Sequence, residues 1–202
     1  ADLGNSRIQK FAPDGTFLLE WGSPGDANGE FVEPNFVAID REAGRIYVSE
    51  FLNNRVQAFD LDGNFIDKWA SQGSENGQFV HPAAIAVNAD GLVFVGDTQN
   101  GTGGRVQIFD QYGTYKGELP DTFTEIWGLA FDAAGNLYVA DYWANRIQVY
   151  DPNLVLIGTI ENVEGAGPFE HPIGLAVDAD GNLYVSDYDN QRLLKLQIPV
   201  AA

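Results

Sequence analysis

The fold class that the sequence predicts is all-β: a β-propeller made of repeated four-stranded blades. One pattern recurs along the chain: an apolar strand, an Asp- and Gly-containing turn, a second strand that ends in an acid, and a third strand that an Arg opens. Copies begin at Phe31, Phe79, Phe123 and Phe169, so the period is 44 to 48 residues. A period in the forties with several short strands per unit is typical of propeller blades.

The copy that begins at Phe169 shows each expected element in order. Residues 173–177 form an apolar strand, and residues 178–182 (DADGN) turn the chain, with Gly supplying the positive φ that a tight turn requires. Residues 183–186 form a second strand that closes on Asp187, and residues 192–196 alternate as a third strand. Earlier copies add a fourth strand, expected at 17–21, 65–69, 114–119 and 154–160.

The repeats predict a single domain over 1–202 with about four and a half copies. The expected limits are a half repeat at 1–30 and full repeats at 31–78, 79–122, 123–168 and 169–202. The expected number of strands is then two in the half repeat, four in each of the next three repeats and three in the last repeat. This count leaves three alternatives: part of a longer propeller, an unusual small ring, or an open arc. We favour an incomplete propeller, whose uncovered edge strands would need a partner.

Charge limits the classes of partner. Eleven Lys and Arg face 29 Asp and Glu, for a formal net charge of −18. Because nucleic-acid affinity depends on clustered Lys and Arg, nucleic acid is not expected, whereas a cationic protein or peptide is. No apolar run is long enough to span a membrane. The absence of Cys fits an extracellular or periplasmic location.

An acid at the end of the second strand recurs with the Arg of the third strand. We interpret these pairs as structural ties, each a charge-assisted hydrogen bond between strands, rather than as anion sites. The pairs are Asp2 with Arg7, Glu50 with Arg55, Asp97 with Arg105, Asp141 with Arg146, and Asp187 with Arg192.

A polar residue precedes the innermost strand of each blade, two positions after the repeat-starting Phe. These residues are Glu33, His81, Glu125 and His171, and they include both His of the chain. Gathered at the mouth of a central channel, alternating carboxylates and imidazoles would be candidate ligands for a divalent metal such as zinc or calcium. The alternative is that the position accepts a polar residue before Pro. The DADGN stretch also resembles the start of a calcium loop, but the strand after it favours a hairpin turn.

Aromatic residues mark a candidate binding surface. Trp127 stands near the expected channel mouth, and Tyr142, Trp143 and Tyr188 follow the acid of the second strand. Exposed aromatic rings supply contact area for a peptide or a sugar. The alternative is that these rings pack between blades.

The sequence resembles the NHL-repeat family of β-propellers. The residues that carry the resemblance are IYVSEFLNNRVQAFD (46–60), LYVADYWANRIQVYD (137–151) and ADLGNSRIQKF (1–11). The resemblance implies a propeller, commonly six-bladed, that binds partners through its loop-bearing faces. It also implies that some relatives are metal-dependent lyases or hydrolases, while the relatives that bind RNA do so on a basic face, unlike this acidic chain.

These observations lead to one expected function and two alternatives. We expect a non-enzymatic binding or assembly module that contacts other proteins through its loops and its terminal edge strands. The alternatives are a metal-dependent lyase or hydrolase at the channel mouth, and a structural subunit that self-associates through edge strands. No nucleophile motif or phosphate-binding loop is present, so no catalytic residue is assigned.

Overall fold

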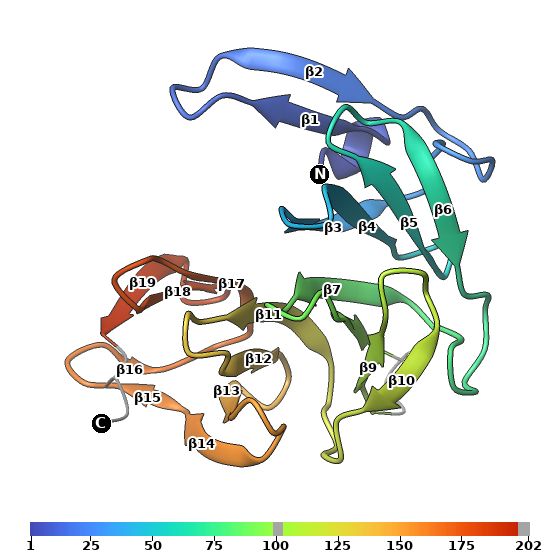
Figure 1. Cartoon of the computed structure of the whole chain (residues 1–202). Coiled ribbons are helices and arrows are strands. Elements are labelled where there is room, and N and C mark those ends of the chain that lie inside the picture. Colours follow the sequence, from blue (N-terminus) through green and yellow to red (C-terminus); the bar gives the residue numbers. More distant parts are fainter. Residues whose placement is uncertain (99–102, 198–202) are drawn as a thin grey trace.

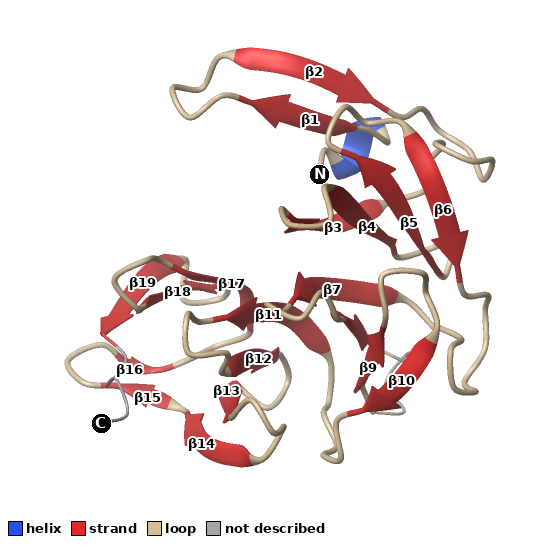
Figure 2. Ribbon diagram, viewed as in Figure 1, coloured by secondary structure: helices blue, strands red, loops and turns tan. Residues whose placement is uncertain are grey.

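The computed structural model describes residues 1–98 and 103–197, and these residues are organised almost entirely as β-strands (Figure 2). A 3₁₀ turn, η1 (Leu3–Asn5), is the one helical element among them. No helix in this part of the chain is long and apolar enough to cross a membrane. The predicted all-β fold class is confirmed.

The strands form antiparallel sheets in the predicted order of two, four, four, four and three. The sheets comprise β1 (Ile8–Phe11) and β2 (Phe17–Trp21); β3 (Pro34–Asp40), β4 (Arg45–Glu50), β5 (Arg55–Asp60) and β6 (Phe65–Trp69); β7 (Pro82–Val87), β8 (Val93–Asp97), β9 (Arg105–Phe109) and β10 (Tyr115–Glu118); β11 (Ile126–Phe131), β12 (Leu137–Asp141), β13 (Arg146–Tyr150) and β14 (Leu156–Ile160); and β17 (Pro172–Val177), β18 (Asn182–Asp187) and β19 (Arg192–Gln197). A short hairpin that the repeat pattern did not indicate, β15 (Asn162–Val163) with β16 (Gly167–Pro168), lies before the last blade.

The sheets are four propeller blades with the hairpin β1–β2 in addition, and they follow one another around a common centre (Figure 1). The first strands of successive blades pack together, β3 on β7, β7 on β11 and β11 on β17. In Figure 1, β1–β2 and β17–β19 stand at the two ends of this series. The loops that join the second and third strands of a blade, such as 51–54, 142–145 and 188–191, lie on one face of the propeller, called here the loop face. The tight turns that join the other strands of a blade lie on the opposite face, called here the turn face.

Apolar side chains close each interface between neighbouring blades. Trp21 packs at 5.8 Å on Phe59, and Trp69 packs at 6.4 Å on Phe109, in equivalent positions of two successive interfaces. The repeat-starting Phe residues are buried in these interfaces. The outward face of the last blade is uncovered: Leu193 is 70% exposed, whereas its counterparts Val56, Val106 and Ile147 are fully buried.

The recurrent acid and Arg are paired in every copy. Four of the pairs lie directly opposite each other across two strands, Asp2 and Arg7 form an isolated bridge, and all five Arg contact their acids. In the four blades the acid also accepts a backbone N–H from the segment before the first strand of its own blade; for example, Asp187 accepts from Glu170 N at 2.7 Å. Arg192 in turn donates to the carbonyl oxygens of Ala166 and Pro168. The pair thus ties the third strand and the preceding loop to one blade.

The DADGN stretch is a hairpin turn. One carboxylate oxygen of Asp178 accepts the backbone N–H groups of Asp180 and Asn182, and the side chains of Asn182 and Tyr184 also donate to this carboxylate. The hydrogen bonds from Asn182 are the main reason why the pKa of Asp178 falls to about 2. The carboxylate oxygens of Asp178, which would open a calcium loop, therefore hold the turn instead.

This turn predicts a specific acid sensitivity. Because the pKa of Asp178 is lowered to about 2 from 3.8, its stabilising contribution is complete above about pH 4 and is lost as the pH falls through about 2. We expect Asp178→Ala to be less stable than the unmodified chain at pH 6, with the difference shrinking towards pH 2. Urea unfolding at several pH values measures it. A difference that grows on acidification would contradict the assignment.

Candidate functional site

Two aromatic rings on the loop face bridge neighbouring blades. The position after the second-strand acid carries Phe51 in one blade and Tyr142 in another. Phe51 stacks on His81 with centroids 4.3 Å apart and planes at 12°, and Tyr142 stacks on His171 at 4.5 Å and 18°. In both cases the His precedes the first strand of the following blade. The same arrangement therefore occurs twice, at two blade junctions.

Trp127 and Trp143 connect these two stacks into one surface. Trp127 lies 5.7 Å from Phe51 and 6.2 Å from Tyr142, and Trp143 lies edge-on to both Tyr142 and His171 at 4.9 and 4.7 Å. We call this surface the aromatic band. It consists of Phe51, His81, Trp127, Tyr142, Trp143 and His171.

The aromatic band is accessible at one end. Trp143 is 57% exposed, while the other rings of the band are half-buried. Tyr188, whose backbone N–H donates to the carbonyl oxygen of His171, is 59% exposed. A cavity of about 570 Å³ adjoins this end. Ala144 and Asn145, which directly follow Trp143, line the cavity together with Glu161 and Glu170. A ligand that covers Trp143 therefore has room to continue across the loop face.

Carboxylates lie beside the band. Trp127 donates its indole N–H to Glu125 Oε2 at 3.0 Å, and His171 Nδ1 hydrogen-bonds to the carboxylate of Asp189. Partial burial raises the pKa of Tyr142, and the negative charges of Asp189 and Glu125 raise it further. Both carboxylates thus act on the central ring of the band.

The structure does not bring the four predicted metal ligands together. Within residues 1–98 and 103–197, no group of three or more His, Asp and Glu side chains is placed to hold a metal ion. The physical reason is that the two imidazoles are stacked at separate blade junctions, and the carboxylate of Glu125 accepts from Trp127. Glu33, His81 and His171 all have positive φ, between 51° and 65°, so the shared feature of this position is a backbone turn before Pro.

Of the four residues predicted as a binding surface, the structure joins three by ring contacts: Trp127, Tyr142 and Trp143. The backbone N–H of Tyr188 donates to the carbonyl oxygen of His171, which places Tyr188 beside the band. The stacking of the two His on Phe51 and Tyr142, and the hydrogen bond between His171 and Asp189, were not predicted, because the two His were interpreted as candidate metal ligands. The sequence did carry one signal for these ring stacks, because the residue after the second-strand acid is aromatic in three of the four blades.

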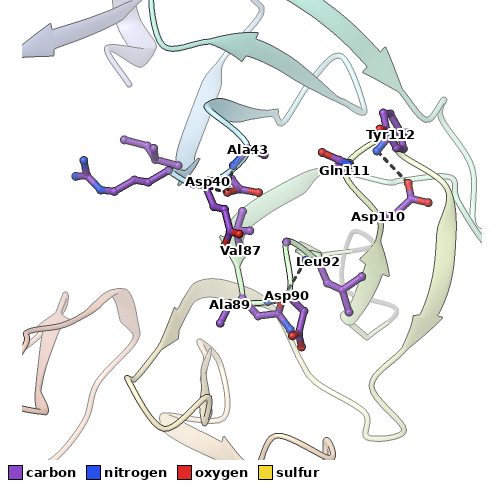
Figure 3. Close-up of a pocket in the computed structure, with 14 residues that line it drawn as sticks. Asp40, Ala43, Val87, Ala89, Asp90, Leu92, Asp110, Gln111 and Tyr112 are labelled. Atoms are coloured by element: carbon purple, nitrogen blue, oxygen red, sulfur yellow. Dashed lines mark hydrogen bonds between the residues drawn. The ribbon is translucent and has the colours of Figure 1, made fainter.

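A larger cavity of about 790 Å³ lies on the turn face, between the blades β3–β6 and β7–β10 (Figure 3). Its polar atoms mostly serve the turns themselves: Asp40 accepts from Ala43 N, and Asp110 accepts from Tyr112 N. Arg45 donates to Gln111 O and lies over the Tyr112 ring. Because these groups already have partners within the chain, the aromatic band is the stronger candidate site.

The fold and the loop-face surface define the chain as a β-propeller that presents an aromatic face. The NHL repeat family matches residues 123–150 and 169–196, which are the third and fourth copies of the motif. These two segments of the chain therefore match NHL repeats, in keeping with the resemblance seen in the sequence.

Solved structures share this fold. A chain from a nidogen/laminin complex is 19% identical with a TM-score of 0.68, and the match covers 83% of this chain and 60% of that one. Virginiamycin B lyase from Staphylococcus aureus with quinupristin is 15% identical (TM-score 0.66, 97% and 60% covered). Hydrazine synthase of Kuenenia stuttgartiensis is 14% identical (TM-score 0.68, 97% and 66% covered). The chain spans less than two thirds of each of these proteins, and no curated protein matches it.

Proposed function

We propose that the chain is a protein-binding module that holds a polypeptide segment of its partner against the aromatic band. The observation that carries this proposal is the continuous run of ring contacts from His81 to Trp143, which ends in a side chain that is 57% exposed. Large aromatic side chains are enriched among the residues that dominate binding energy at protein interfaces.

The shape of the loop face supports a polypeptide ligand. The cavity beside Trp143 is lined by the acidic side chains of Glu161 and Glu170, whereas the amides of Asn145 and Asn190 already form hydrogen bonds within the chain. Acidic groups complement the N–H groups of an extended main chain better than an apolar slot would. The similar fold in a nidogen/laminin complex also favours a role in protein–protein contact. The alternative of a metal-dependent lyase or hydrolase has no comparable support, because the described residues contain no assembled ligand set.

An array of random-sequence dodecapeptides tests the proposal. We expect the chain to bind a subset of the peptides, and Trp143→Ala to weaken this binding by about tenfold or more, which is the effect of losing one aromatic anchor. The matched control is Tyr112→Ala. Tyr112 is another exposed aromatic, at 62%, but it lies at the turn-face cavity, so its removal should leave peptide binding unchanged.

Two results would contradict the proposal. One is that no peptide on the array binds the intact chain. The other is that Trp143→Ala and Tyr112→Ala weaken binding equally, since this would place the contact away from the aromatic band. Circular dichroism of both variants checks that each keeps the fold.

A further inference from the structure

The ligand group that the aromatic band would take can be read from its charges. Asp189 and Glu125 flank the rings, through His171 and Trp127 respectively. The side chain of Asp189 is 43% exposed, so its charge acts on the same solvent-accessible end as Trp143. The accessible rings therefore lie in a negative field, and a cation is the group that this field attracts.

The positive groups of the chain lie elsewhere or are already paired. Arg146 and Arg192, on the blades that carry this end of the band, are bound to Asp141 and Asp187. Among the described residues, the cation–ring contacts are Arg45 over Tyr112 and Lys195 over Tyr184, and neither involves the band. Hence no Lys or Arg in the described part of the chain covers the rings of the band.

We propose that the aromatic band recognises an alkylammonium group, the charged end of a lysine side chain in the bound polypeptide. An ammonium within about 6 Å of the face of a Trp or Tyr ring is attracted by the ring, and neighbouring carboxylates add to this attraction. The exposed ring of Trp143 supplies the face, and Asp189, which is hydrogen-bonded to the His171 ring that Trp143 contacts, supplies the countercharge. The inference rests on the proposed function and adds the chemical class of its ligand.

A matched pair of small probes tests it on the intact chain. Nα-acetyl-lysine methylamide and Nα-acetyl-norleucine methylamide have side chains of similar length, and only the first is charged. We follow the indole N–H signals of Trp127 and Trp143 by NMR at low salt during titration. We expect the lysine probe to shift these signals and the norleucine probe to bind about tenfold more weakly. Added KCl should weaken binding of the lysine probe, because exposed charges are screened.

Two variants locate the effect. Asp189→Asn keeps a hydrogen-bonding side chain beside His171 but removes the charge, and it should weaken lysine binding several-fold while leaving norleucine binding unchanged. Tyr112→Ala on the turn face should change neither probe. Equal binding of the two probes to the intact chain, or an equal loss of both in Asp189→Asn, would overturn the inference.

The failure of this inference is distinguishable from that of the proposed function. If array peptides bind in a manner that depends on Trp143 but show no preference for lysine, the polypeptide site stands and the alkylammonium specificity is wrong. If the lysine probe binds at the band but no array peptide does, the specificity stands and the polypeptide site is wrong.

Discussion

Replacing Arg55 with alanine is expected to destabilise the chain by about 3–5 kcal/mol, because the change leaves a buried carboxylate without its cation. The Glu50 side chain is fully buried and that of Arg55 is 8% exposed. Arg55 also donates to the carbonyl oxygens of Asp26, Ala27 and Glu30, so its loss removes three further hydrogen bonds to this loop. Urea unfolding followed by tryptophan fluorescence measures the change.

The chain contains a matched control for this prediction. Arg7 and Asp2 occupy the same positions of the repeat, but their side chains are 32% and 28% exposed. Solvent screens such a pair, so Arg7→Ala should destabilise the chain far less than Arg55→Ala does. Equal costs for the two variants would show that burial does not determine the strength of these ties.

Gly128→Ala is the second change with a large expected effect, a loss of about 3 kcal/mol at the upper end of the overpacking range. Gly128 lies on β11, and a Cβ at this position would come within 2.1 Å of the backbone oxygen of Ile173 on the next blade and 2.9 Å of Leu175. Backbone atoms cannot move aside as a side-chain tip can. The two blades must therefore separate, and unfolding in urea should shift to lower concentration.

Gly158→Ala on β14 provides the control, because a Cβ at this position meets nothing within 4 Å. We expect it to be neutral or slightly stabilising, since alanine loses less conformational freedom on folding than glycine does. If Gly128→Ala is as stable as Gly158→Ala, the close approach of β11 to β17 is wrong.

The sequence predicted the blades well because local rules and packing agree in each repeat. Period-two strands, Asp-Gly turns and the acid–Arg pairs all repeat, so the strands assigned in one repeat are supported by the same pattern in the others. The order of two, four, four, four and three strands is confirmed. The hairpin β15–β16 escaped prediction because it has no counterpart in the other copies.

The candidate site was less predictable, because it depends on contacts between blades. Sequence spacing placed His81 and His171 at equivalent positions, and equivalence suggested shared ligation of a metal. Only the three-dimensional structure shows that each imidazole instead stacks on the aromatic residue of the preceding blade. The sequence of one repeat does not indicate which ring of the neighbouring blade its side chains will contact.

The role of the aromatic band in binding is tested most directly by the four tryptophan indole signals in an NMR titration with the tightest-binding array peptide. Trp127 and Trp143 belong to the band, whereas the indole nitrogens of Trp21 and Trp69 are buried between blades. We predict that the Trp127 and Trp143 signals shift with a common dissociation constant while those of Trp21 and Trp69 stay in place. Saturable binding that leaves the Trp127 and Trp143 signals unchanged would contradict the account.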